Sequence, residues 1–557
     1  MAGKQTNKKL LGLVVLATMA LVVGGAIMFL QRWGRRDPSF YVQQALDACR
    51  AGQIAQAVGA YTRAYRETRD PRWYVEAGLV AKAFGDADKA LAYFDKAIAA
   101  RSDYLPAHRQ RVELRLELVR QSPSPTPEKY ANLRKDADAL LSVDPTDPQA
   151  MLAQSVALAG LIREDPTYSR RSLEVIEKAH ELAPKDVEIA DTLACMREQR
   201  DLTQGGPDAG ARGPTPAEEV YRRLLQSVPE DGMAPLRYGQ FLIRRLERRQ
   251  EEEEGRGRSL PTAAIRQDLE KIHALLTQAE RLTRRDGEIP LAWARYWSLA
   301  GQRTKAIEVL SQAVRAVPDD LRIHLELADR MLQSGQTGQA REVLQQGLAR
   351  PFNRDSYRGL LDRPRRYRLM CLLGLSYVLG VSPGSPAALE SAAKAEQIWR
   401  EAETELPEDH WMGHYLLGRI RQVQGRLPAA AAAYRAADKM LEWRGETSGK
   451  LTVQLALSDV QWRLEQYGPA EETLEQILRH RPNHPIARAL HSWVALRVGK
   501  ARVAAAEAGQ VLARSEQDTT MGAPSTLPAG LLGETDWIRQ TARVWWAASQ
   551  LENLPTD

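Results

Sequence analysis

A four-position spacing recurs six times in the chain and constrains its fold more than any other feature. In each copy a glycine is followed five residues later by alanine and nine residues later by Tyr, Phe, Leu or Ala. The copies begin at Gly52, Gly85, Gly301, Gly335, Gly425 and Gly499. The first two copies lie 33 residues apart, and the third and fourth lie 34 apart. A period of about 34 residues is typical of stacked helical hairpins, which bury their apolar faces only against neighbouring copies.

The copy at Gly85 shows the physical reason for the spacing. We expect Gly85 to end one helix, because a helix C-terminus favours a left-handed residue. Ala90 then lies in the next helix, where a small side chain lets the two helices approach closely. Phe94 and Ala97 follow at steps of four and three residues, which places all three on one helix face. The pattern therefore predicts an antiparallel pair of helices.

Small residues also mark the preceding helices, as in Ala77-Gly78, Leu373-Gly374 and Leu417-Gly418. Together with the recurring spacing, these residues resemble the tetratricopeptide repeat family over roughly Pro38 to Arg514. The resemblance implies an all-α, right-handed solenoid that binds extended or helical peptides of other proteins in a concave groove. It implies no cofactor and no catalytic role.

Counting outward from the clear copies predicts about twelve hairpins. They start near Pro38, Pro71, Leu105, Pro148, Val187, Gly232, Asp286, Leu321, Tyr367, Trp411, Leu451 and Pro485. Segments rich in Pro, Gly, Ser or charge interrupt the pattern and are interpreted as solvated loops. These segments are 122–129, 202–216, 250–258, 351–366 and 381–387.

The chain is divided by these patterns into six parts. Residues 1–9 form a short tail, 10–30 a transmembrane helix and 31–37 a juxtamembrane linker. Residues 38–286 form an N-terminal array with loop insertions, and 287–514 a more regular C-terminal array. Residues 515–557 are predicted to be a linker and a C-terminal capping helix, because Trp537, Ile538, Val544, Trp545 and Leu551 recur at helical spacing.

The transmembrane prediction rests on 21 uncharged residues from Leu10 to Leu30. At 1.5 Å per residue they span about 31 Å, which is close to the hydrocarbon thickness of a bilayer. A cleaved signal peptide has a shorter apolar stretch of about 7–15 residues, so we expect an uncleaved anchor. Lysines precede the stretch and arginines follow it, and this slight asymmetry favours a cytoplasmic N-terminus. The repeats would then lie outside the cytoplasm, for example on the bacterial inner membrane.

A partner-binding groove is predicted on the first helices of the last three hairpins, where stripes at three- and four-residue steps combine guanidinium groups with aromatic rings. Such a surface suits a partner with acidic and aromatic or aliphatic side chains. The alternative is that the tryptophans pack between helices while the arginines remain solvated. The stripe residues are Tyr415, Arg419, Asp459, Trp462, Arg463, Trp493 and Arg497.

A basic segment is the second candidate surface. It can hold phosphate or anionic lipid, and the alternatives are a solvated loop or a contact with an acidic protein face. Its arginines are Arg350, Arg354, Arg358, Arg363, Arg365, Arg366 and Arg368.

Other classes of function find little support in the sequence. The net charge of +6 over 557 residues does not indicate nucleic-acid binding. Residues 380–384 match the letters of a nucleophile elbow, but Pro383 lacks the N–H that this site needs. The i, i+4 histidine pairs His410/His414 and His480/His484 each straddle a predicted helix boundary, so no metal site is predicted. The three cysteines, Cys49, Cys195 and Cys371, are interpreted as helix-packing residues rather than bridges.

These observations predict a non-enzymatic, membrane-tethered scaffold that binds other proteins through its groove, in a cell-envelope or secretion assembly. The alternative is an accessory subunit that positions a glycan-synthesis or export enzyme. Neither reading requires a small-molecule substrate.

Overall fold

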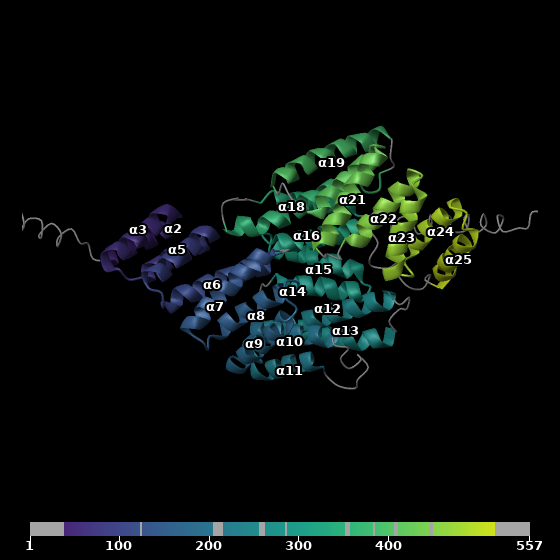
Figure 1. Cartoon of the computed structure of the whole chain (residues 1–557). Helices are drawn as coiled ribbons and strands as arrows, with labels where there is room; N and C mark the ends of the chain where they lie inside the picture. The colour runs from purple at the N-terminus through teal and green to yellow at the C-terminus, as the bar shows by residue number, and fades with distance from the viewer. Residues whose placement is uncertain are drawn as a thin grey trace, which may run out of the picture. The chain divides into compact units, whose positions relative to one another are not determined.

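The computed structural model describes residues 38–122, 125–203, 215–255, 262–283, 287–350, 357–381, 385–405, 410–444 and 449–517 (Figure 1). The predicted transmembrane helix at 10–30 and the predicted capping helix beyond residue 515 lie outside these ranges, apart from the last turn of α25. Among the described residues, no helix combines the length and the apolar character needed to cross a bilayer.

The secondary structure of the described residues consists of 24 helices and no strands, arranged as twelve hairpins. The first helices of the hairpins are α2 (Pro38–Arg50), α4 (Arg72–Ala83), α6 (Leu105–Gln121), α8 (Pro148–Gly160), α10 (Val187–Thr203), α12 (Met233–Gly255), α14 (Glu288–Leu299), α16 (Leu321–Gln333), α18 (Tyr357–Val378), α20 (Trp411–Val423), α22 (Lys450–Arg463) and α24 (Pro485–Arg497). The second helices are α3 (Ile54–Thr68), α5 (Ala87–Ala100), α7 (Pro127–Val143), α9 (Tyr168–Leu182), α11 (Pro216–Ser227), α13 (Thr262–Leu282), α15 (Arg303–Ala316), α17 (Thr337–Leu348), α19 (Pro386–Glu405), α21 (Leu427–Arg444), α23 (Tyr467–His480) and α25 (Ala501–Gln517).

The predicted hairpin starts agree with the observed first helices to within two residues at eleven of twelve positions. The exception is the ninth hairpin, because α18 begins at Tyr357 and not at Tyr367. The all-α, repeat-type architecture expected from the sequence is therefore confirmed for the described residues.

Two of the predicted loops, 250–258 and 351–366, are wrong in the part that the structure describes, because residues 250–255 and 357–366 are helical. The acidic run 251–254 belongs to the last turns of α12, and residues 357–366 form the first half of α18, with Pro364 inside the helix. Glu, Arg and Leu are good helix formers, so a run of them continues a helix readily. Pro364 lacks one backbone N–H, which weakens a helix locally without having to end it.

Two compact units are present. One contains the described residues up to 175 together with 357–360, and the other contains those from 176 to 350 together with 361–517. In the second unit an apolar core cluster runs from α14 to α22, and a smaller one joins α22, α23, α24 and α25. In the first unit a core cluster joins α2, α3 and α4.

The glycines of the recurring spacing have the predicted left-handed conformation. Gly52, Gly85, Gly301, Gly335, Gly425 and Gly499 all have φ between 69° and 92°. At Gly425 the backbone N–H of the next residue, Arg426, donates to Arg421 O at 2.8 Å and closes the turn. This bond is the 6→1 bond that ends many helices.

The alanines and the helical glycines allow close packing within a hairpin. Ala90, Ala306, Ala340 and Ala430 are all 0% exposed. A Cβ atom added to Gly418 would collide with the ring of Tyr434, and one added to Gly78 would lie 2.5 Å from the ring of Phe94. The aromatic ring of the second helix therefore occupies space that a side chain on the first helix would fill.

One hairpin turn has the same geometry but carries a glutamate, not a glycine, at its left-handed position, and this difference generates a prediction. Between α22 and α23, Glu465 has φ 61°, and Gln466 N donates to Gln461 O at 2.9 Å, as in the glycine turns. A left-handed conformation costs a residue with a Cβ about 1 kcal/mol. We expect Glu465→Gly to stabilise this hairpin by about 1 kcal/mol and Gly425→Ala to destabilise its own by a similar amount. The measurement is thermal unfolding followed by circular dichroism.

Gly59→Ala supplies the matched control, because Gly59 lies inside α3 and, like Gly425, has no atom within 4 Å of an added Cβ. Replacing a glycine inside a helix with alanine stabilises the helix by about 0.5–1 kcal/mol. If Gly425→Ala and Gly59→Ala shift the unfolding temperature in the same direction, left-handed strain does not govern these turns.

Candidate functional site

Five of the predicted groove residues are brought together by α22 and α24. We call Asp459, Trp462, Arg463, Trp493 and Arg497 the aromatic–arginine cluster. The ring centroids of Trp462 and Trp493 are 4.2 Å apart at an interplanar angle of 56°. Both rings are partly buried and pack against the core cluster of the last two hairpins. The two first helices are therefore joined by direct aromatic contact.

The arginines of this cluster lie against the indole rings and reach solvent. The guanidinium carbon of Arg463 is 5.6 Å from the centroid of Trp462, and that of Arg497 is 5.0 Å from Trp493. Asp459 accepts hydrogen bonds from Trp462 Nε1 at 3.2 Å and from Arg463 Nε at 3.1 Å. Arg463 and Arg497 are both exposed, and Arg497 pairs with no carboxylate among the described residues. The tryptophans pack between helices as in the alternative reading, yet the guanidinium groups stay at the surface.

The other two predicted groove residues have different surroundings. Tyr415 is 7% exposed and packs against Tyr434, with ring centroids 5.7 Å apart, so its ring is core rather than surface. Arg419 Nη1 donates to Gln422 Oε1 at 3.1 Å. Burial alone would lower the pKa of Arg419, but the neighbouring Tyr434, Tyr415 and Asp459 outweigh it and raise the pKa. The guanidinium of Arg419 therefore stays charged although it is partly buried between the first helices.

Gln422 links these buried residues to the cluster, and the sequence analysis missed it. Its Oε1 accepts from Tyr434 Oη at 2.9 Å, and its Nε2 donates to Asp459 Oδ2 at 2.7 Å. Gln422 therefore orients Asp459, which in turn orients Arg463. Its place seven residues after Tyr415 on the same stripe was the available signal.

The basic segment is helical from residue 357 on, within α18, and only Arg350 among its described arginines lies outside a helix. Arg350 pairs with Asp319 at 3.2 Å, Arg365 Nη1 donates to Asp362 at 2.9 Å, and Arg366 Nη1 donates to Leu348 O at 2.8 Å. Arg368 is exposed and Arg363 half-buried. Arg354 and the side chain of Arg358 lie outside the described residues. Several of these guanidinium groups are thus engaged within the protein, which weakens the case for an anion-binding loop.

The first helices of the middle hairpins carry buried acidic side chains close to arginines, a feature that the sequence analysis did not single out. Burial and the nearby Glu326 raise the pKa of Asp329, on α16, to about 6, while Arg330 and Arg368 oppose the shift. Burial also raises the pKa of Glu247 on α12, although the charges of Arg295 and Arg330 oppose this shift.

A cavity of about 170 Å³ lies between α12, α14 and α16. The residues that line it are Gln240, Ile243, Glu288, Leu291, Ala292, Arg295 and Arg322.

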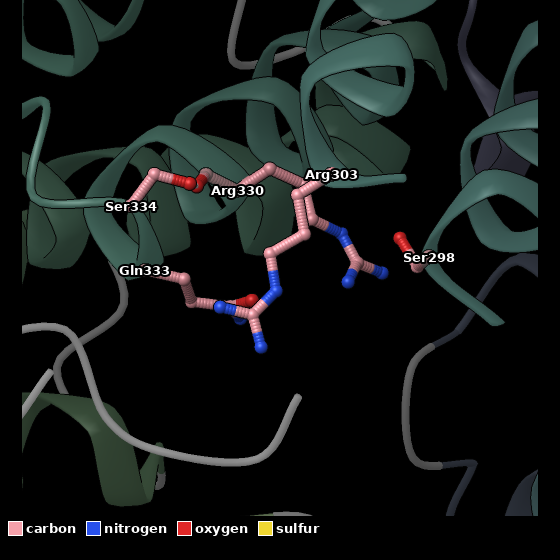
Figure 2. Close-up of a pocket in the computed structure, with 5 residues that line it drawn as sticks. All are labelled: Ser298, Arg303, Arg330, Gln333 and Ser334. Carbon is pink, nitrogen blue, oxygen red and sulfur yellow. The ribbon is translucent and has the colours of Figure 1, made fainter. Parts of the chain in front are cut away.

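A second cavity beside α15 gathers two arginines (Figure 2). Ser298, Arg303, Arg330, Gln333 and Ser334 line it, and its volume is about 10 Å³. Burial and the positive charge of Arg330 lower the pKa of Arg303. Arg330 is itself paired with Glu326 at 2.7 Å. The cavity has room for about one water molecule, so it is not a substrate site.

Two of the four histidines considered as metal ligands cap helices. His410 Nδ1 accepts from Met412 N at 3.3 Å at the start of α20, and His484 Nδ1 accepts from Ala487 N at 3.2 Å at the start of α24. Both i, i+4 pairs straddle a helix boundary, as predicted. Residues 382–384 of the elbow-like match lie outside the described residues, and α18 rather than a strand precedes them.

The cysteines have the chemistry of packing residues. Cys371 is fully buried, and burial raises its thiol pKa. Burial, reinforced by Asp191, also raises the pKa of Cys195 to about 11. A protonated thiol is a poor nucleophile and a poor metal ligand. All three cysteines are free thiols.

Comparison with known proteins identifies the repeats. Residues 42–104 and residues 299–363 each match a tetratricopeptide repeat family. None of the curated proteins compared with the chain matches its sequence.

Solved structures similar to this chain include three helical-repeat proteins. Yeast Tom70 is 12% identical over 92% of this chain and 96% of its own, with a TM-score of 0.38. The Cut9–Hcn1 hetero-tetramer of the APC/C is 12% identical over 93% and 98%, with a TM-score of 0.37. A tetratricopeptide repeat protein of Parabacteroides merdae is 12% identical over 53% and 98%, also with a TM-score of 0.37.

The two family matches fall on α2–α5 and on the hairpins around α15–α17, where the glycine turns and buried alanines were found. Sequence pattern, turn geometry and packing thus agree, and the chain carries tetratricopeptide repeats within an all-helical array.

Proposed function

We propose that this chain is a membrane-tethered scaffold that holds protein partners at the aromatic–arginine cluster, within a cell-envelope or secretion assembly. The repeat fold is that of a protein-interaction scaffold, and tetratricopeptide repeat proteins generally bind other proteins. The observation that supports this particular site is the exposure of Arg463 and Arg497 against the indoles of Trp462 and Trp493.

The chemistry of the cluster favours an acidic partner segment with an apolar or aromatic side chain. Exposed guanidinium groups form bidentate hydrogen bonds to carboxylates. Trp and Arg are enriched among the residues that dominate binding energy at interfaces. Because Asp459 and Gln422 already fix Arg463, little side-chain freedom is lost when a partner binds.

Reversing both charges tests the site. We expect the full-length Arg463→Glu/Arg497→Glu variant, solubilised in detergent from its own membranes, to recover the acidic partner at least about tenfold less well than the wild type, because two attractive contacts become repulsive. Quantitative mass spectrometry of the captured proteins gives the ratio. Circular dichroism checks the fold, since the glutamate that replaces Arg463 would face Asp459 and cost about 0.5 kcal/mol.

Arg435→Glu is the matched control, because Arg435 is an exposed arginine on a second helix, α21. A protein lost from the double variant but kept by the wild type and by Arg435→Glu supports the proposed site. Equal recovery by all three forms places partner binding elsewhere. Recovery of one glycan-synthesis or export enzyme would favour the accessory-subunit role.

Membrane attachment through residues 10–30 is the second part of the proposal. Twenty-one uncharged residues suffice to span a bilayer, and a tether raises the effective concentration of partners in the same membrane. We expect a chain lacking residues 1–30 to move from the membrane fraction to the soluble fraction after alkaline extraction. Retention of this truncated chain in the membrane contradicts the anchor.

Protease treatment of intact cells tests the orientation with the full chain. The repeats should be digested from outside once any outer membrane is made permeable, because the N-terminus is expected in the cytoplasm. Full protection until the inner membrane is disrupted would reverse the proposed topology.

A further inference from the structure

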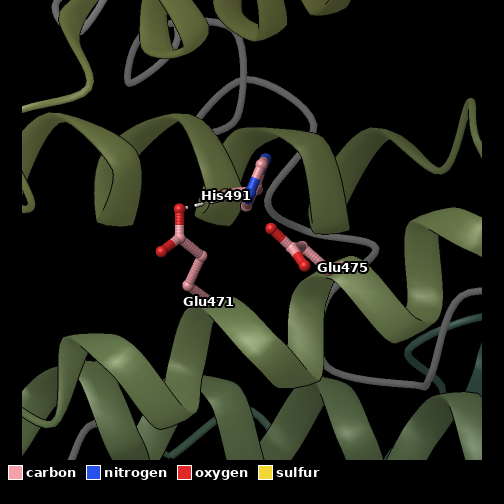
Figure 3. A group of neighbouring side chains, drawn as sticks. All are labelled: Glu471, Glu475 and His491. Atoms are coloured by element: carbon pink, nitrogen blue, oxygen red, sulfur yellow. Dashed lines mark ion pairs between the residues drawn. The ribbon is translucent and has the colours of Figure 1, made fainter.

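Two carboxylates and an imidazole converge between the last two hairpins. Glu471 and Glu475 lie four residues apart on one face of α23, and His491 comes from α24 (Figure 3). One side-chain ligand atom from each residue lies within 4.8 Å of the others. The three residues come from two helices, so the cluster exists only when the hairpins are stacked.

His491 is the unusual member of this group. It is 6% exposed, and neither of its ring nitrogens has a hydrogen-bond partner. Its Nε2 lies 4.0 Å from Glu471 Oε1, which is within ion-pair distance but too far for a hydrogen bond (Figure 3). Leaving a buried polar group unpaired costs about 1–3 kcal/mol, so this imidazole is poised for a ligand at Nε2.

A third carboxylate stands behind the imidazole. Glu507 Oε1, on α25, is 3.7 Å from His491 Nδ1. The other oxygen of this carboxylate, Oε2, accepts a hydrogen bond from Arg488 Nη1. Histidines that bind metal through one nitrogen commonly have a carboxylate at the other, which fixes the ring and raises its basicity.

We propose that Glu471, Glu475 and His491 form a binding site for a divalent transition-metal ion such as Zn²⁺. One imidazole nitrogen and two carboxylate oxygens are a donor set that suits this class of ion. Ligand atoms around a tetrahedral zinc ion are about 3.3 Å apart, so the present separations must shorten by up to about 1.5 Å. Three protein ligands leave one position for water or for a group of a partner.

Lys500 competes for this site. Its Nζ donates to Glu471 Oε1 at 2.8 Å. Its side chain is 48% exposed, so it can turn into solvent when an ion arrives. The sequence analysis predicted no metal because it considered only pairs of histidines, whereas these ligands combine one histidine with glutamates of the preceding helix.

The test uses the full-length chain in detergent, stripped of metal with a chelator and titrated with Zn²⁺ by calorimetry and with Co²⁺ by visible absorption. We expect one equivalent of Zn²⁺ to bind with micromolar affinity or better, and Co²⁺ to give the absorption of a low-coordinate site. His491→Gln and Glu475→Gln should each weaken binding by at least about tenfold. Glu475 is partly exposed, so its variant should fold even if the His491 variant does not.

Two further variants sharpen the result. Glu472→Gln is the matched control, because Glu472 is an exposed neighbour on α23 that does not belong to the cluster, and its variant should bind as the wild type does. Lys500→Met should bind Zn²⁺ about tenfold more tightly, because it removes a positive charge a few ångströms from a doubly charged ion.

The proposal is overturned if the wild type binds no Zn²⁺ at micromolar concentration, which would leave His491 as a packing residue between Glu471 and Glu507. It is also overturned if Glu475→Gln binds as tightly as Glu472→Gln, or if Lys500→Met binds no better than the wild type. These outcomes do not depend on partner capture at the aromatic–arginine cluster, which can succeed or fail separately.

Discussion

The close approach of the two helices in each hairpin is the constraint on which the rest of the structure depends. Gly418 packs against the ring of Tyr434, and Gly78 packs against the ring of Phe94. Because glycine has no side chain, the aromatic ring of the second helix fits directly against the backbone of the first helix. This contact sets the spacing within a hairpin, where the small, fully buried alanines of the second helices also allow a close approach. The exposed stripes of the first helices then lie side by side, so residues one repeat apart in sequence meet at the surface.

Much of the fold could be predicted because its signals are local. A left-handed glycine followed by a buried alanine marks six of the hairpin turns, and counting outward from these six placed eleven hairpin starts to within two residues. The two incorrectly predicted loops are segments in which a high density of charged residues was interpreted as evidence for a loop. The acidic end of α12 and the arginine-rich start of α18 are helical, because helix formation depends on side-chain entropy and neighbouring packing more than on polarity.

Only part of the geometry of the candidate site can be inferred from the sequence. The stripe pattern named both Trp462 and Trp493, whose ring centroids lie 4.2 Å apart, whereas burial of Tyr415 depends on the shape of a packed interior. Gln422 could not be recognised as the link to Asp459 without knowing that Tyr434 and Arg419 reach it. The convergence of Glu471, Glu475 and His491 likewise arises from stacking and has no compact motif in the sequence.

The pattern of helix contacts has a consequence for how the chain is made. Within each unit the main contacts join consecutive helices, or the first helices of consecutive hairpins, such as α12 with α14 and α22 with α24. Each hairpin can therefore find its native neighbours soon after it leaves the ribosome, since it needs only the hairpin synthesised just before it. A nascent chain of this kind adds its apolar surfaces in small steps and covers each one before the next appears.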